Sequence, residues 1–202
     1  MRRDSFLPFP APPVTLGQAT EVRSTLLATS LQSIRKHGLL DLYQRHLTGP
    51  FKETVLTAVA GSWLPINAAK AHYLACDALR LEPAVQLAIG MEVGDRVNGT
   101  FLGFMVRTAK TAGVTPWHAL AQATKLYFRV FQGGGGIAIG ELGPKEARVE
   151  LVGNMLYDID YFRNGCRGFF QAATRLFCNR VYTYDLSRGR NANGMTLRIS
   201  WA

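Results

Sequence analysis

The stretch from 83 to 113 constrains the fold most, because it combines a long helical pattern with four spaced glycines. Its apolar residues recur at four-residue steps, which is typical of a helix with one buried face; they are Val85, Ile89, Val93, Val97, Phe101 and Met105. Each glycine in a helix costs about 1 kcal/mol relative to alanine. A helix that accepts this cost gains close packing, a bend or space for a ligand. We expect the rest of the chain to pack around it.

The glycines of this helix form two pairs, Gly90 with Gly94 and Gly99 with Gly103. The members of each pair are four residues apart, so they lie on one helical face where a second backbone can approach closely. This face fits the interface of a two-fold homodimer. It fits nearly as well a contact with the helix expected at 115–132 of the same chain.

Composition indicates one domain with a tail. A chain of 202 residues with 48% hydrophobic residues can bury one substantial core. Residues 1–17 are rich in proline and are expected to form an extended or flexible tail, and residues 18–202 the domain. Charged residues interrupt the 83–113 helix, so we expect no transmembrane segment. Three cysteines without CxxC spacing are typical of reduced thiols in a cytoplasmic protein.

The net charge of +9 raises the question of an acidic partner. The excess is spread evenly along the chain, which weakens a nucleic-acid interpretation. Only the last third concentrates arginine, including Arg188 and Arg190. An ordinary solvated face explains this better than an anion-binding one, so a nucleic-acid partner is not favoured.

The order of elements predicts an α+β fold. Helical patterns cover 21–37, 39–47, 51–59, 66–81, 83–113 and 115–132, and the turn GSWLP interrupts them after residue 60. Strand patterns follow at 137–142 and 147–152, then a helix at 155–178, then strands at 181–186 and 195–201. Two hairpins joined by an apolar helix predict a four-stranded antiparallel sheet with helices on one face.

No catalytic, metal or cofactor site emerges from the residues. Asp158 and Asp160 could bind a hard cation, but acids near a helix start also complement its dipole, which is the favoured interpretation. The histidines, His37, His46, His72 and His118, match no metal-binding spacing. Cys166 lies between two arginines that could activate it, yet its place on an apolar stripe favours an inert thiol. We therefore expect a protein that is not an enzyme and has no cofactor.

Aromatic residues are the positive signal. They concentrate on three helices that are expected to meet, where they either fill a core or line an apolar pocket. The candidates for a ligand pocket are Phe101, Phe104, Trp117, Tyr127, Phe131, Phe162 and Phe169.

Three features together resemble a known group of proteins: the GSWLP turn before a helix, the aromatic helix before a glycine run, and a ββαββ end with a final tryptophan. They resemble a paralogous family of unknown function from myxobacteria. That family is similar to vinyl-reductase-type small-molecule-binding domains, and both are placed with the heme-NO-binding and TRAPP-type folds.

The resemblance implies a dimeric module that binds a hydrophobic small molecule or lipid in sensing or regulation, with the glycine face as the dimer interface. The alternative is a protein-interaction scaffold with a filled core. Two departures matter. The last hairpin lacks the cysteines of vinyl-reductase-type domains, and Tyr184 to Arg188 has the residue types of the heme-NO family's propionate motif at different spacing. Heme binding is therefore not carried over.

Overall fold

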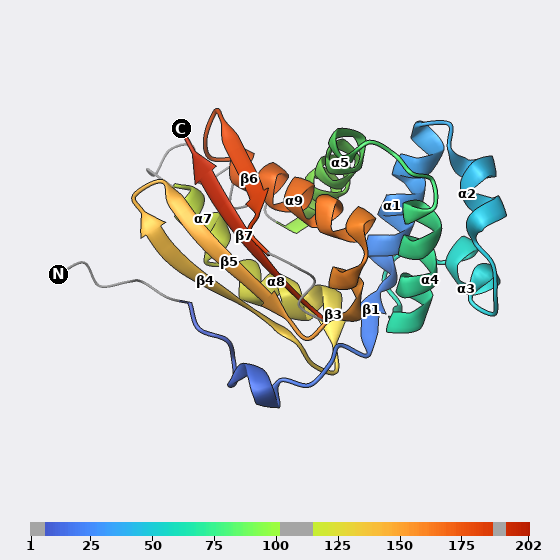
Figure 1. Ribbon diagram of the computed structural model, residues 1–202, viewed down its shortest axis with the longest axis horizontal. Coiled ribbons are helices and arrows are strands. Elements are labelled where there is room, and N and C mark those ends of the chain that lie inside the picture. Colours follow the sequence, from blue (N-terminus) through green and yellow to red (C-terminus); the bar gives the residue numbers. More distant parts are fainter. Residues whose placement is uncertain (1–6, 102–114, 188–192) are drawn as a thin grey trace.

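Four antiparallel strands form the main sheet of the computed structural model, which describes residues 7–101, 115–187 and 193–202, with only the backbone for 98–101 (Figure 1). The strand order is β4-β5-β7-β6; the strands are β4 (Gly136–Gly143), β5 (Glu146–Val152), β6 (Val181–Asp185) and β7 (Gly194–Trp201). In β7 the residues Met195, Leu197, Ile199 and Trp201 are buried and Arg198 is exposed. This alternation of burial is that of a strand with one face against the core, and it agrees with the strand predicted at 195–201.

Helices cover one face of this sheet and continue beyond it. In Figure 1, α1 to α4 gather at the end of the molecule farthest from the sheet, while α9 crosses between them and the strands. The helices are α1 (Ser24–Lys36), α2 (Leu40–His46), α3 (Lys52–Leu56), α4 (Ile66–Asp77), α5 (Pro83–Phe101), α7 (Pro116–Leu120), α8 (Ala123–Val130) and α9 (Asp160–Arg175). Short 3-10 turns lie at Pro13–Thr15 and Met155–Asp158. The predicted α+β class is confirmed.

A second, three-stranded sheet was not predicted. It has the order β2-β1-β3 and consists of β1 (Glu21–Arg23), β2 (Trp63–Pro65) and β3 (Phe131–Gln132). Val22 of β1 pairs with Leu64 on one side and Phe131 on the other. The stretch GSWLP is thus partly strand rather than only a turn. Three strands of two or three residues are too short for a period of two to emerge from the sequence.

The helix expected at 115–132 is two helices in the structure. Thr115 caps the first through a capping box with His118, whose Nδ1 accepts from the Thr115 backbone N–H. The chain then turns at Ala121 and Gln122 before α8 begins. Tail residues also contribute, since the backbone of Leu7 exchanges hydrogen bonds with Ile139 at the edge of β4. Within the described residues, no helix combines the length and apolarity needed to cross a membrane.

The glycine face of α5 packs against α9 of the same chain. A Cβ atom at Gly90 would overlap the carbonyl oxygen of Gly165, and one at Gly94 would lie 2.9 Å from the Cβ of Ala172. From the other side, a Cβ atom at Gly168 would overlap the carbonyl oxygen of Leu87.

This contact corrects the expected use of the face. At Gly90 and Gly94 the position predicted for a second protomer, or for the 115–132 helix, is occupied by α9. Gly99 and Gly103 lie outside the residues whose surroundings the structure describes. The two-fold dimer, and a role for Gly99 and Gly103 in its interface, stay predictions.

Replacing Gly90 by alanine should lower the free energy of unfolding by about 1–3 kcal/mol, because the new methyl group overlaps backbone that cannot move independently. Gly165→Ala is the matched control on the facing helix. A Cβ atom there meets nothing within 4 Å, so this change should raise stability by up to about 1 kcal/mol. Urea unfolding measures both. Equal effects of the two substitutions, or a change of mass in sedimentation for Gly90→Ala, would contradict an intramolecular contact.

Candidate functional site

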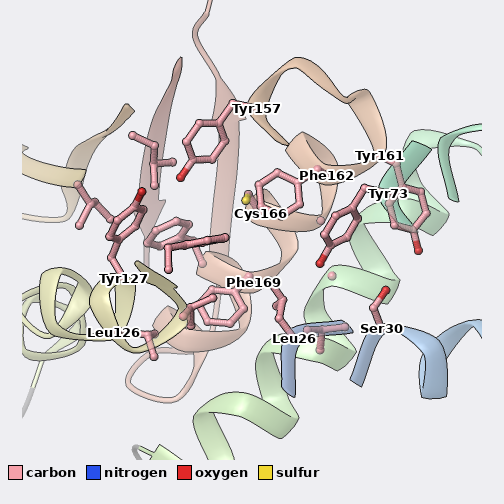
Figure 2. A pocket seen from close by; sticks show the side chains of 18 of the residues that line it. Leu26, Ser30, Tyr73, Leu126, Tyr127, Tyr157, Tyr161, Phe162, Cys166 and Phe169 are labelled. Carbon is pink, nitrogen blue, oxygen red and sulfur yellow. The ribbon is translucent and has the colours of Figure 1, made fainter. Parts of the chain in front are cut away.

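An apolar cavity of about 100 Å³ lies where α5, α8 and α9 meet the inner face of the main sheet (Figure 2). It is partly enclosed, and its walls are mostly aliphatic and aromatic. The lining residues are Leu26, Ser30, Tyr73, Ile89, Gly90, Val93, Ala123, Leu126, Tyr127, Val130, Phe131, Ile137, Leu151, Tyr157, Tyr161, Phe162, Gly165, Cys166, Phe169 and Phe170. The facing glycines Gly90 and Gly165 both line it, so the α5–α9 contact forms part of its wall.

Among the residues that the structure describes, the lining contains no aspartate, glutamate, lysine, arginine or histidine. Its titratable groups are four tyrosines and one cysteine, and all are neutral at physiological pH. Burial raises the pKa of Cys166 to about 12, although Arg163 acts in the opposite direction. Burial likewise raises the pKa of Tyr73, Tyr157 and Tyr161 above the usual range of a phenol. The cavity therefore offers apolar contact and hydrogen bonds but no charge, nucleophile or general base.

The structure brings four of the seven predicted pocket aromatics together: Tyr127, Phe131, Phe162 and Phe169 all line the cavity. Trp117 lies outside it. Its ring packs edge-to-face on Trp201 at 5.0 Å, and its indole N–H donates to the carbonyl of Pro144. Phe101 and Phe104 fall outside the residues whose side chains the structure describes.

Sequence reasoning missed Ser30, Tyr73, Tyr157 and Tyr161. On α4, Tyr73 is buried whereas its neighbour Leu74 is exposed. The true apolar stripe of α4 runs through Ile66, Ala69, Tyr73 and Cys76. Its spacing of three and four residues was present in the sequence.

A chain of buried hydrogen bonds runs from α2 to the cavity. The hydroxyl of Tyr43 lies 2.7 Å from Nδ1 of His72, and Nε2 of His72 lies 2.9 Å from Oγ of Ser30. His72 has no exposed surface, and burial lowers its pKa to about 3. The imidazole is therefore neutral and both of its nitrogens are occupied.

The hydroxyl groups of Tyr73 and Tyr161 lie near Ser30 at the same end of the cavity (Figure 2). Tyr161 is only 2% exposed, and its hydroxyl faces Ser30 and Cys76 without forming a hydrogen bond of acceptable geometry to either. The hydroxyls of Tyr73 and, at the other end of the cavity, of Tyr157 likewise have no hydrogen-bond partner among the described residues, but of the three only that of Tyr161 is fully buried. Buried polar atoms are rarely left without a partner, so this end of the cavity is unusual.

Stability should fall in mild acid because of His72. Its pKa is about 3 when folded and about 6.5 when unfolded, so the unfolded chain takes up the proton first as pH falls. The contribution is complete above pH 6.5 and is lost on acidification toward pH 3, by up to about 1.4 kcal/mol per unit. Urea unfolding at several pH values measures the slope. His72→Gln should flatten it, while the same change at the exposed His46 should not.

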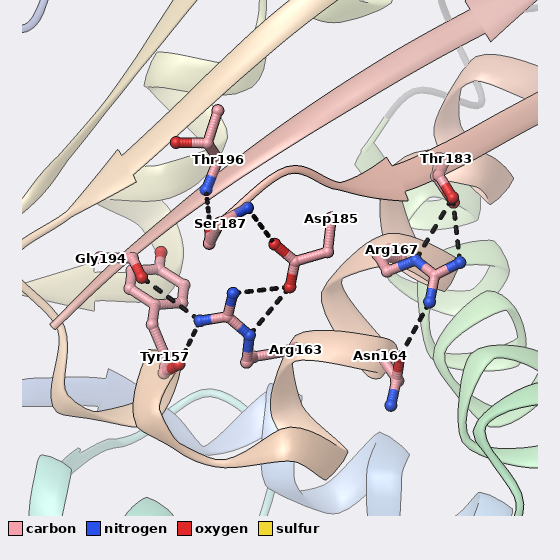
Figure 3. Close-up of polar contacts among 9 residues, drawn as sticks. All are labelled: Tyr157, Arg163, Asn164, Arg167, Thr183, Asp185, Ser187, Gly194 and Thr196. Atoms are coloured by element: carbon pink, nitrogen blue, oxygen red, sulfur yellow. Dashed lines mark hydrogen bonds and ion pairs between the residues drawn. The ribbon is translucent and has the colours of Figure 1, made fainter. Parts of the chain in front are cut away.

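The arginines Arg163 and Arg167 of α9 form a polar cluster at the ends of β6 and β7 (Figure 3). Arg163 is 7% exposed and donates two hydrogen bonds to Oδ2 of Asp185, at 2.6 and 2.9 Å, and one to the carbonyl of Tyr157. Arg167 donates to the carbonyl of Thr183 and to Asn164. The other oxygen of Asp185 accepts from the backbone N–H of Ser187.

This cluster gives Tyr184 to Ser187 a structural role. Ser187 accepts from the backbone N–H of Thr196, and so holds the end of β6 beside β7. Tyr184 is 48% exposed on the outer face of the sheet, away from the cavity, and Arg188 lies outside the described residues. A polar groove of about 390 Å³ beside the cluster is lined by Asp77, Arg80, Leu81, Pro83, Gln86, Asp160, Arg163, Asn164 and Asp185.

No group of three or more possible metal ligands occurs within the described ranges. Asp158 accepts a hydrogen bond from the backbone of Asn193, and Asp160 lies in the first turn of α9, as expected for a helix-dipole role. His37 pairs with Glu92, and His118 caps α7.

Asp185→Ala should destabilise the protein by about 3–5 kcal/mol, because it leaves a buried guanidinium without its carboxylate. Glu150→Ala is the control. It breaks the pair with Arg148 on the outer face of the sheet, where Arg148 is half exposed, and should cost at most about 1 kcal/mol. Chemical denaturation compares the two. Similar losses for both variants would show that the Arg163–Asp185 pair does not hold α9 to the sheet.

The fold is that of H-NOX domains. Three solved structures illustrate the similarity. An Fe(II) unliganded H-NOX mutant from K. algicida aligns with a TM-score of 0.65 and 9% identity, covering 89% of this chain and 96% of that one. An oxygen-binding H-NOX domain related to soluble guanylate cyclases gives 0.59 and 11%, covering 89% and 94%. A mutant of the T. tengcongensis H-NOX domain gives 0.57 and 15%, covering 89% and 97%.

These comparisons establish the heme-NO-binding relation at the level of fold. Searches by sequence found no match, either to a family model or to a curated protein. The resemblance to a myxobacterial family therefore stays a prediction.

Proposed function

We propose that this chain is a non-enzymatic module that binds a small, neutral, largely apolar molecule in sensing or regulation. The observation that carries the proposal is the apolar cavity bounded by α5, α8, α9 and the main sheet. The solved structures similar to this chain include an oxygen-binding domain, which supports a sensory role. The uncharged lining supports binding rather than catalysis.

The size of the cavity limits the ligand. Apolar cavities of about 150 Å³ stay dry and bind benzene or xenon, and this one measures about 100 Å³. It therefore suits a molecule of about four to six non-hydrogen atoms. The acyl chain of a lipid exceeds this space, so the small-molecule part of the sequence prediction is favoured over the lipid part.

Heme, which other proteins of this fold bind according to their descriptions, does not fit the residues present. Heme iron is held by an axial histidine, thiolate, methionine or tyrosinate. None of the four histidines lines the cavity, and burial keeps Cys166 and the tyrosines protonated. Pockets for larger ligands measure about 300–1,000 Å³, well above the volume here. We derive no role for this chain through heme.

The two alternatives from the sequence receive less support. A scaffold with a filled core does not explain the cavity. For nucleic acid, ion pairs neutralise several arginines of the last third, among them Arg148 with Glu150, Arg175 with Asp95 and Arg198 with Glu146. Arg188 and Arg190 lie outside the described residues, so a role for them stays a prediction.

Filling the cavity should abolish binding without unfolding the protein. Gly165 lines the cavity and an added Cβ atom there meets nothing within 4 Å, so the side chain of Gly165→Leu has room to enter it. In NMR titration with benzene or cyclopentane, the wild type should show saturable shifts of cavity methyl groups, and Gly165→Leu should show none. Ala84→Leu, at an exposed position on α5, should bind as the wild type does.

Saturable binding that persists in Gly165→Leu would place the ligand elsewhere. Purification with stoichiometric heme, detected by its Soret absorption, would contradict the small-ligand proposal itself.

A further inference from the structure

We infer that the ligand of the cavity is a neutral molecule of the carbonyl class, a small ketone, aldehyde or ester, whose oxygen accepts hydrogen bonds from Tyr161 and from one of its neighbours, Tyr73 or Ser30. This inference rests on the proposed function and specifies the chemistry of its ligand. The observation that carries it is a buried hydroxyl without a partner, that of Tyr161, in the wall of an otherwise apolar cavity.

The direction of the buried hydrogen-bond chain makes Ser30 a donor toward the cavity. Tyr43 is fully buried, and within the described part of the chain its hydroxyl has only His72 Nδ1 as an acceptor. The phenol therefore donates to Nδ1, and the neutral imidazole carries its hydrogen on Nε2. Nε2 in turn donates to Oγ of Ser30. The hydrogen of the Ser30 hydroxyl is left to donate to the cavity or to the hydroxyls beside it.

Tyr161 and Tyr73 bring two further donors to the same end. Neither hydroxyl has a hydrogen-bond partner among the described residues. An unpaired buried hydroxyl costs about 1–3 kcal/mol, whereas phenylalanine would fill the same space without that cost. A bound molecule that accepts a hydrogen bond from the Tyr161 hydroxyl would remove this cost and explain why tyrosine rather than phenylalanine occupies the position.

Three donors at one end select an acceptor. A carbonyl oxygen has two lone pairs and can satisfy two hydroxyl groups at once, while an alcohol brings another hydrogen that needs an acceptor of its own. A carboxylate is disfavoured on electrostatic grounds, since no described lysine, arginine or histidine lines the cavity to compensate the buried charge. A pure hydrocarbon fits the walls but leaves the hydroxyl groups unpaired.

The test compares two probes of nearly equal shape, cyclopentanone and methylenecyclopentane, which differ in the acceptor oxygen. Binding is measured by NMR titration of the full-length protein. The wild type should bind the ketone about tenfold more tightly than the hydrocarbon, as expected for one buried hydrogen bond. Tyr161→Phe should remove most of this preference by weakening the ketone alone. Tyr127→Phe, which removes a lining hydroxyl that already donates to the carbonyl of Gly134, should keep the preference.

Three other outcomes would each contradict a different claim. Equal affinity of the wild type for both probes overturns the inference and leaves the proposed function intact. Binding of neither probe, while Gly165→Leu and wild type behave alike, overturns the proposed function as well. A ketone preference that survives in Tyr161→Phe but disappears in Tyr127→Phe overturns the assignment to this end of the cavity.

Stability supplies an independent readout that does not require a ligand. Tyr161→Phe removes a hydroxyl without a partner and should raise the melting temperature of the free protein. Tyr43→Phe removes one that is bonded to His72 and should lower it. A lower melting temperature for Tyr161→Phe would show that its hydroxyl already has a structural partner, which overturns the inference.

Discussion

The backbone contact between α5 and α9 is the constraint on which the interior depends. Gly90 and Gly94 on one helix and Gly168 on the other let the two backbones touch, so the helices cross at a distance that a side chain at these positions would forbid. The same contact forms part of the cavity wall, because Gly90 lines the cavity and so does Gly165, whose carbonyl oxygen a Cβ atom at Gly90 would overlap. A Cβ atom at Gly90 would therefore affect both the packing of the two helices and the space beside them.

Much of the architecture follows from local patterns in the sequence. Alternation from Met195 to Trp201, and the two hairpins on either side of one apolar helix, were sufficient to predict the four-stranded sheet. The small sheet was missed because its strands belong to distant parts of the chain, joined through Val22 to Leu64 and Phe131. Pairings of this kind are non-local, and each strand is too short to carry a period.

The sequence indicated the type of site, an apolar pocket with aromatic walls, but only some of the residues that line it. Helical spacing shows which side chains share a face, and it grouped Tyr127, Phe131, Phe162 and Phe169, which line the same cavity. The spacing of Gly90 and Gly94 predicted a face that another backbone can approach closely, and the structure places α9 there. The predicted partners, a second protomer or the 115–132 helix, were wrong at these two positions, because spacing does not show which backbone approaches. The unpaired hydroxyls could not be found from sequence at all, because the absence of a hydrogen bond depends on the position of every neighbour.

The chain shares its fold with H-NOX domains, but the chemistry of its interior depends on its own residues. An α+β framework is shared over 89% of this chain at about 10% identity, so it is maintained by packing patterns rather than by particular residues. Within that framework, both ring nitrogens of His72, the one buried histidine among the described residues, are paired with Tyr43 and Ser30. Asp185 and Ser187, which lie in the segment with the residue types of a propionate motif, hold the end of β6 beside β7 instead. Among the described residues, the polar groups that face the cavity are neutral hydroxyls on an apolar wall. An apolar wall with a few hydroxyl groups favours neutral molecules over charged ones, because a buried charge without a partner is costly.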